Sequence, residues 1–394
     1  MPRFKTPEWM LTALAERREQ HLFRSTHVVA SPQTTRLTQS GQEYLAFCSN
    51  DYLGLANHPV LKQAMSDAAL EYGVGSGASH LVCGHLDIHD ALEHELCEWL
   101  GYERVLLFST GYMANLAVIS ALASKQRPVL MDKLNHASLI DGARLSEAVF
   151  KRYLHNDTDS AKKHMQRLEM PGVLATDGIF SMDGDKAPLV ELADLAQQQD
   201  WLLVVDDAHG LGCLGQHGKG CLELDGLSAE QVPFLMGTFG KAFGVAGAFV
   251  ACSNDMADYL TQFARPYIYT TAMPPAVAAT VLASLGLIRS EEGQQRRQTL
   301  SSHVQYLRQR AESWPYEIMD SDSAIQPLLI GSSETALAIS DKLMQRGILC
   351  KAIRPPTVPP NTARLRLTLS ADHSHKDVEY LCDTLDSIFN DDSK

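Results

Sequence analysis

The sequence predicts an α/β protein, with a mostly parallel sheet flanked by helices and a smaller C-terminal α+β domain. Short apolar runs alternate with helical patterns between about residues 105 and 252, as in strands covered on both faces. Near residue 290 the pattern changes to a long polar helix followed by an alternating strand. The 394 residues also exceed the usual size of one domain. We expect an N-terminal helix and arm at 1–45, a large domain at 46–288 and a small domain at 289–394.

The N-terminal part of the chain is predicted to hold two helices and a short strand. Residues 9–24 read as an amphipathic helix that ends in a basic patch at Arg24. YLAFC at 44–48 reads as the strand, and 60–72 as the second helix. A glycine-rich loop follows, and apolar residues at helical spacing then lead to Gly101, where a helix C-cap belongs.

The apolar runs of the large domain predict strands that end in polar side chains. The runs are 105–109, 128–131, 173–177, 201–207, 234–237 and 247–252. In open sheets of this kind, ligands bind at the carboxyl ends of the strands. The polar residues found there are Thr110, Asp132, Asp177, Asp206 and Thr238.

The small domain is predicted to hold an antiparallel sheet. A strand at 325–330 is followed by a helix that ends at Gly347 and by a strand at 348–353. ARLRLTLS at 363–370 alternates apolar and polar residues, which is typical of a strand packed on one face only.

Charge and cysteine content restrict the partners and the compartment. The formal charge is 34 − 47 = −13, which repels nucleic acid and anionic membranes, so we expect neither as a partner. The eight cysteines form no C-x-x-C pair and are expected to be reduced thiols of a cytoplasmic protein. The N-terminal residues do not resemble a signal peptide.

Lys241 is the first candidate for covalent chemistry. It lies in GTFGKAFG, after a short apolar strand, where Gly240 and Gly244 leave space for a flat group near the backbone. A lysine removed from water has a lowered pKa and can attack an aldehyde as a neutral amine. Thr238, three residues earlier, could bind a phosphate. Alone, Lys241 also fits a solvated loop.

Asp206 and His209 in VVDDAHG extend this hypothesis. Asp206 follows an apolar strand, and a carboxylate there can keep a pyridine nitrogen protonated, so that the ring draws electrons. His209 could reach an oxygen on the same ring. By itself, Asp206 equally fits a carboxylate that caps the following turn.

Three further segments supply candidate contacts. In FSTGYMAN, Gly111 and Tyr112 stand where a strand gives way to a helix, and free N–H groups at a helix start bind phosphate. His136 in LNHASL could stack on an aromatic ring, and Ser181 in GIFSMDGD could contact the same cofactor. Each also fits an ordinary structural role, but together they occur in the order that one pyridoxal-phosphate (PLP) fold requires.

These motifs, with SNDYLGL, GSGAS, TFGKAFG and YIYTTAMPP, resemble the α-oxoamine synthases from about Arg17 to the C-terminus. The resemblance implies PLP-dependent fold type I, the aspartate-aminotransferase architecture, with PLP in the large domain. It also implies a homodimer whose sites lie between the subunits.

The resemblance also implies individual roles. Lys241, Asp206 and His136 would be catalytic: Lys241 holds the cofactor, Asp206 pairs with its ring nitrogen and His136 stacks on the ring. The other implied cofactor contacts are His209 and Ser181 at the ring oxygen, Gly111, Tyr112 and Thr238 at the phosphate, and Thr270 and Thr271 from the partner subunit. The implied substrate contacts are Arg24, Asn50, His136, Thr357 and Arg366, of which Arg366 would bind the amino-acid carboxylate.

The resemblance implies the condensation of an amino acid with an acyl thioester, with loss of CO2. The closest likeness is to members that join L-alanine to a pimeloyl group, carried by coenzyme A or an acyl carrier protein, in biotin biosynthesis. Sister enzymes such as glycine C-acetyltransferase share the same cofactor residues, and a lysine-lacking partner subunit is a more remote alternative. Ala78 and His80 depart from the pattern of many relatives at the implied thioester contacts.

Two rival interpretations lack their context. The G-x-G-x-x-A segment at 73–78 follows a helix, whereas a dinucleotide-binding loop follows a strand. HELCE at 94–98 lacks the second histidine of a metalloprotease helix. We expect no metal.

Overall fold

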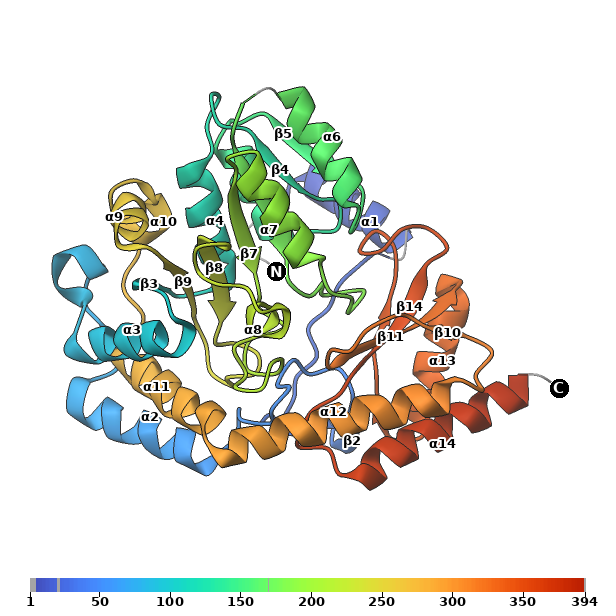
Figure 1. The fold of residues 1–394 in the computed structure, drawn as a ribbon. Helices are drawn as coiled ribbons and strands as arrows, with labels where there is room; N and C mark the ends of the chain where they lie inside the picture. Colours follow the sequence, from blue (N-terminus) through green and yellow to red (C-terminus); the bar gives the residue numbers. More distant parts are fainter. Residues whose placement is uncertain (1–4, 20–21, 169, 393–394) are drawn as a thin grey trace.

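A seven-stranded sheet forms the centre of the molecule (Figure 1). The computed structural model describes residues 5–19, 22–168 and 170–392. The strand order is β3-β9-β8-β7-β6-β4-β5. The strands are β3 (Arg104–Phe108), β4 (Val129–Asp132), β5 (Phe150–Tyr153), β6 (Val173–Asp177), β7 (Leu202–Asp206), β8 (Phe234–Thr238) and β9 (Ala248–Cys252).

Helices cover both faces of this sheet, as the apolar runs predict. One face packs on α4, α5, α9 and α10, and the other packs on α2, α3, α6, α7 and α11. The helices are α2 (Pro59–Tyr72), α3 (Asp87–Leu100), α4 (Gly111–Leu122), α5 (Ala137–Leu145), α6 (Thr158–Leu168), α7 (Leu189–Gln198), α8 (Cys221–Asp225), α9 (Asn254–Phe263), α10 (Arg265–Ile268) and α11 (Pro275–Arg289). A short π-helical turn spans His80–Gly84. Along β7, Leu203 and Val205 enter one core while Val204 enters the other.

The sheet is mostly parallel, and β9 is the exception. It pairs antiparallel with both β3 and β8, whereas β8, β7, β6, β4 and β5 run parallel to one another. The sequence does not predict the edge strand β5. Its segment FKRY carries two exposed basic side chains and forms no apolar run.

A second, four-stranded antiparallel sheet lies in the C-terminal part, in the order β10-β11-β14-β13. Its strands are β10 (Glu317–Ile318), β11 (Ile325–Gly331), β13 (Ala352–Ile353) and β14 (Ala363–Thr368). The long helix α12 (Glu291–Ala311) leads to this sheet from α11, and α13 (Ser333–Gln345) and α14 (His375–Asp392) accompany it (Figure 1).

Two predictions for this sheet were wrong. The predicted strand at 348–353 is divided: β12 (Ile348–Leu349) pairs with β2 (Gln42–Ala46) in a small sheet that also holds β1 (Arg36–Gln39), while β13 pairs with β14. β14 is buried on both faces, with Arg364 only 3% exposed and Arg366 only 9% exposed. Its polar face turns toward the large sheet, where these guanidinium groups find partners.

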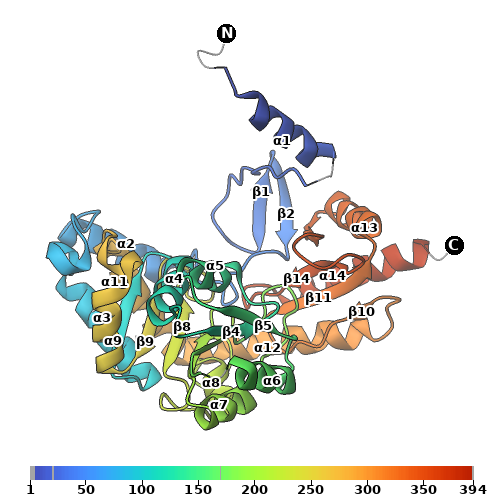
Figure 2. The same cartoon turned by 90° about the horizontal axis from the view of Figure 1, so that it is seen from above.

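The N-terminal helix is shorter than predicted. α1 spans Glu8–Glu19, so Arg24 lies beyond it, and residues 20–21 of the predicted helix lie outside the described residues. None of its residues is buried, and its apolar residues form no clear stripe, so the expected amphipathic packing is absent. Figure 2 shows α1 set apart from both larger sheets. Over the described ranges, every helix falls short of the length and apolarity that a membrane crossing requires.

Candidate active site

A cavity of about 190 Å³ opens at the carboxyl ends of the parallel strands. The residues that line it come from α4, from the turn between β4 and α5, and from the strands β6, β7 and β8 with the loops that follow them. They are Gly111, Tyr112, Asn115, His136, Asp177, Ser181, Asp206, Ala208, His209, Met236, Thr238 and Lys241. All eight same-chain cofactor contacts that the sequence predicts are therefore in one place.

Lys241 reaches this cavity from the turn after β8. Gly244 has φ +68° and lies so close to Ala56 that a Cβ atom would come within 2.4 Å of the Ala56 nitrogen. This close approach explains the glycine that follows the lysine in the motif. Burial lowers the pKa of Lys241 to about 8, and the attraction of Asp206 and Asp177 only partly opposes that shift. The amine is therefore partly neutral near neutral pH.

His209 links the lysine to a buried tyrosine. Its Nε2 atom lies 2.7 Å from Nζ of Lys241, and its Nδ1 atom lies 2.6 Å from the hydroxyl of Tyr52. Burial lowers the pKa of His209 well below its usual value, so the ring is neutral. Burial also raises the pKa of Tyr52 to about 12, which keeps its hydroxyl protonated.

Two carboxylates stand side by side at the strand ends. Asp177 and Asp206 are paired in the register of β6 and β7. Asp206 accepts hydrogen bonds from Asn115 Nδ2 at 2.7 Å and from the Ala208 N–H at 3.0 Å. Burial, and next the charge of Asp206, raise the pKa of Asp177 well above its usual value. The pair thus stands in a low-dielectric place that would favour a cationic ligand.

The start of α4 and the end of β8 form a possible phosphate site. Thr110 caps α4 by accepting a hydrogen bond from the Met113 N–H at 3.2 Å. Gly111 is the first helical residue, and a Cβ atom there would lie 3.8 Å from Oγ1 of Thr238. An anion would meet free N–H groups, the positive end of the helix dipole and a hydroxyl group.

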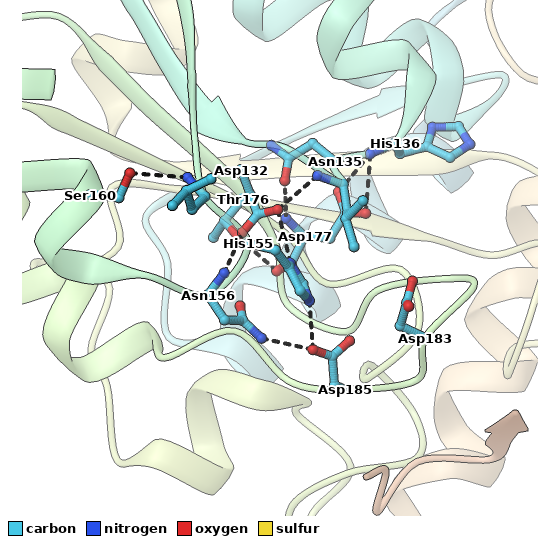
Figure 3. Close-up of polar contacts among 12 residues, drawn as sticks. Asp132, Asn135, His136, His155, Asn156, Ser160, Thr176, Asp177, Asp183 and Asp185 are labelled. Atoms are coloured by element: carbon cyan, nitrogen blue, oxygen red, sulfur yellow. Dashed lines mark hydrogen bonds and ion pairs between the residues drawn. The ribbon is translucent and has the colours of Figure 1, made fainter. Parts of the chain in front are cut away.

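His136 lies on the other side of the cavity, at the start of α5. Its backbone N–H donates to both carboxylate oxygens of Asp177, at 3.2 and 3.3 Å (Figure 3). Its Nδ1 atom lies 2.7 Å from Oγ of Ser138, and its ring stands edge-on to Tyr112. The ring is exposed and free to cover a flat ligand.

Arg366 approaches the cavity from the small sheet. Its Nε donates to the Ser181 carbonyl at 2.6 Å, and both terminal nitrogens lie 3.3 Å from Oδ1 of Asn50. Tyr52 also donates to that oxygen, at 3.2 Å. The predicted substrate contacts Asn50 and Arg366 thus lie together, beside the cavity.

Four further predicted residues lie neither in the cavity nor beside it. Arg24 and Thr357 share a separate hollow of about 130 Å³ with Arg354. Thr270 and Thr271 line a small pocket near Tyr267. Within one chain these four residues therefore do not meet Lys241.

Sequence reasoning missed Tyr52 and Asn115 and did not assign a role to Asp177. Tyr52 belongs to SNDYLGL, and its burial cannot be read from that motif alone. Asn115 stands one helical turn after Gly111, on the same face of α4, and this i, i+4 spacing is the signal that could have found it. Over the described ranges, His, Cys, Asp and Glu side chains form no group of three or more suited to a metal.

A family model described as aminotransferase class I and II matches residues 42–385. The chain belongs to this family. The match includes both larger sheets and every residue that lines the 190 Å³ cavity.

Relatives and solved structures resemble this chain over most of its length. An 8-amino-7-oxononanoate synthase from Marinomonas sp. is 62% identical over 383 residues, which is 97% of this chain and 95% of the relative. A serine palmitoyltransferase from S. paucimobilis with a bound PLP–myriocin aldimine superposes with a TM-score of 0.90 at 27% identity, covering 96% of each chain. An 8-amino-7-oxononanoate synthase from Francisella tularensis gives 0.78 at 29% identity, covering 89% of this chain and 99% of that one.

Proposed function

We propose that this chain is an 8-amino-7-oxononanoate synthase that uses PLP. It joins L-alanine to a pimeloyl thioester, either pimeloyl-CoA or pimeloyl-acyl carrier protein, and releases CO2 and the free thiol. The observation that carries the proposal is the 62% identity, over nearly the whole of both chains, to a relative of that name. The cavity around Lys241 supplies the chemistry that such a reaction needs.

The residues present fit PLP. Asp206 forms no ion pair with a lysine, arginine or histidine among the described residues, although it accepts two hydrogen bonds. A protonated pyridine nitrogen is the cation that would complete this site. The start of α4 and Thr238 suit the phosphate, His209 and Ser181 suit the ring oxygen, and His136 suits the ring face.

Lys241 would hold the cofactor and later move the proton at the substrate Cα atom. Its pKa of about 8 allows both roles, because the amine can lose and regain a proton near neutral pH. Bound PLP would supply an electron sink for the charge that develops at Cα. Asp206 would maintain that sink by keeping the ring nitrogen protonated.

Arg366 would bind the amino-acid carboxylate. A guanidinium group can bind a carboxylate with two parallel hydrogen bonds, and this fixes which bond at Cα stands perpendicular to the ring. Asn50 and the Ser181 carbonyl already orient the guanidinium group. Substrate geometry thus depends on a residue of the small sheet.

A matched set of substrate pairs tests the proposal. Purified protein with PLP would receive L-alanine with pimeloyl-CoA, glycine with acetyl-CoA, or L-serine with palmitoyl-CoA, and thiol release and product mass would be measured. We expect turnover with the first pair. Preference for another pair would assign the chain to a sister enzyme, and no turnover with any pair would contradict the whole assignment.

We also infer a cytoplasmic homodimer in which Thr270 and Thr271 reach the partner's site. All eight cysteines are free, as expected in a reducing compartment. The placement of both threonines away from Lys241 of their own chain supports the shared site.

Mixing two inactive variants tests the shared site. If Lys241→Ala is combined with Thr270→Ala/Thr271→Ala, each mixed dimer would hold one fully intact site, and activity should reappear. Different affinity tags on the two variants would allow the mixed dimers to be isolated and verified. If they form without activity, the threonines do not act across the interface.

A further inference from the structure

His155 lies outside the cavity, yet both of its ring nitrogens meet carboxylates (Figure 3). Nδ1 lies 3.0 Å from Oδ1 of Asp132, and Nε2 lies 2.7 Å from Oδ2 of Asp185. An ionised carboxylate only accepts hydrogen bonds, so both nitrogens must donate. A neutral ring would place a lone pair against a carboxylate oxygen, and the geometry therefore requires an imidazolium.

The surroundings support this charge. Burial lowers the pKa of His155, but the hydrogen bonds and charges of Asp132 and Asp185 outweigh burial and raise it to about 10. The Asp132 side chain is fully buried, while the side chains of His155 and Asp185 are about a quarter exposed. Two neutral residues complete this group: the Phe180 ring stands edge-on at 4.5 Å, and Asn156 donates to Asp132 through its N–H and to Asp185 through Nδ2.

The first carboxylate belongs to the turn that carries His136. Asp132 ends β4, and its Oδ1 also accepts a hydrogen bond from the Leu134 N–H at 2.8 Å. Asn135 continues this turn and binds the β6 backbone at the Ala175 carbonyl. His136 follows directly and lines the cavity.

The second carboxylate belongs to the loop 178–186, which joins the two larger sheets. Ser181 in this loop lines the cavity, and its carbonyl accepts from Arg366. Asp183 accepts from Arg364 at 2.6 Å, so two neighbouring arginines of β14 bind the same loop. Asp185 therefore attaches the loop to the large sheet through His155, opposite the attachment to the small sheet, and Lys186 adds an ion pair with Asp225 of α8.

We propose that His155 is a positioning residue, which as an imidazolium ties the loop 178–186 to the turn after β4 and so sets the places of Ser181, Arg366 and His136. It touches neither substrate nor cofactor. The inference deepens the proposed function and rests on it only for the identity of the substrate that Arg366 binds.

Two substitutions separate the two bonds of the ring. The amide nitrogen of asparagine takes the place of Nδ1, so His155→Asn keeps a donor toward Asp132 and loses the one toward Asp185. The amide nitrogen of glutamine takes the place of Nε2, so His155→Gln does the reverse. Asp132 keeps two backbone donors in either variant, from Leu134 and Asn156. Within the part of the chain that the structure describes, the Asp185 carboxylate keeps only the Asn156 side chain. The asparagine variant should therefore be the more damaging.

Hydrogen exchange tests the tether without relying on turnover. In His155→Asn, the backbone amides of 178–186 should exchange about tenfold faster than in wild type, with a smaller change in His155→Gln. The imidazole ¹⁵N signals of His155 can be assigned because both variants lack them. In wild type at pH 8, these signals should show that both ring nitrogens are protonated. A neutral ring there, or unchanged exchange in His155→Asn, would overturn the proposal.

Kinetics then link the tether to the site. His155→Asn should raise KM for L-alanine about tenfold, because a small displacement of Arg366 weakens carboxylate binding, and His155→Gln should recover most of that loss. His217→Asn is the matched control, because the His217 ring pairs with Glu223 at 2.6 Å and does not line the cavity. Equal kinetic effects in all three variants would contradict a positioning role. If wild type used another amino acid, the exchange result would still stand while the proposed function failed.

Discussion

The Nζ atom of Lys241 lies 2.7 Å from Nε2 of His209, so the amine meets a neutral ring in place of a carboxylate. A carboxylate at that distance would hold the lysine protonated, whereas a neutral imidazole in a buried place does not. Asp206 and Asp177 act on the amine from farther away. The lysine amine can therefore lose its proton, and the nearby carboxylates remain available to a cationic ligand.

Capture of PLP by the cofactor-free protein should follow the titration of Lys241. Only the neutral amine attacks an aldehyde, so the rate should rise about tenfold per pH unit below pH 8 and level off above it. Stopped-flow absorbance across this range would measure the rate. A rate that does not change with pH would place the lysine pKa outside this range.

Replacing the lysine should abolish turnover while leaving the fold intact. Lys241→Ala should lower kcat by about 10³-fold or more, because the cofactor attachment and the proton carrier are lost together. The absorbance of covalently bound PLP should also disappear. Lys125→Ala, which removes a surface partner of Glu147, is the control and should keep wild-type activity. Wild-type turnover by Lys241→Ala would refute the assignment.

Asp206→Asn should keep PLP bound yet impair catalysis. The amide can still bind Asn115, but it cannot stabilise a protonated ring nitrogen, so kcat should fall about 10²-fold. The bound cofactor can be measured after denaturation. Asp200→Asn is the matched control, since Asp200 lies in a turn with φ +57°, which asparagine tolerates. Unchanged kcat in Asp206→Asn would show that this carboxylate does not serve the ring.

Arg366→Lys should weaken the binding of L-alanine more than that of the thioester. Lysine retains the charge but loses the paired hydrogen bonds, so KM for L-alanine should rise about tenfold or more. Initial rates at varied alanine and fixed thioester would measure this change. Arg289→Lys is the control, because Arg289 at the end of α11 pairs with Glu95 of α3 and does not line the cavity. Equal KM changes for both substrates would argue against carboxylate binding.

Gly220→Ala should destabilise the fold near the end of β7. Gly220 has φ +82°, and a Cβ atom there would lie 1.9 Å from Oδ2 of the buried Asp207. The free energy of unfolding should fall by about 3 kcal/mol or more. Gly226→Ala meets the same backbone strain in open space, at φ +68°, and should cost about 1 kcal/mol. Denaturant unfolding of both variants compares the two losses, and similar losses would mean that Asp207 moves aside.

The main sheet was predictable because its strands are short apolar runs that end in polar residues. Periodicity gives the faces of a strand but not its direction, so the antiparallel course of β9 could not be read from its sequence. β5 has no apolar run. The alternation of β14 predicts a solvated face. The pattern cannot show that the loop 178–186 of the large domain covers the arginines on that face.

The lining of the site was predictable where one motif carries one function. Lys241 and His209 stand at strand ends in distinctive segments. Tyr52 reaches the site through packing between distant segments, which no local pattern specifies. Asn115 could have been found from its i, i+4 spacing to Gly111 on α4. Arg24 shares a hollow with Thr357, and within one chain this hollow is separate from the cavity around Lys241.

The two arginines of β14 have a consequence for recombination between relatives. Arg364 binds Asp183 and Arg366 binds the Ser181 carbonyl, so two arginines of the C-terminal segment have their partners in a loop about 180 residues earlier. A chimera that exchanged only the C-terminal segment would combine the arginines of one relative with the loop of another. A chimera that is to keep the Arg364–Asp183 pair should therefore exchange the loop 178–186 together with β14, although the two segments lie far apart in the chain.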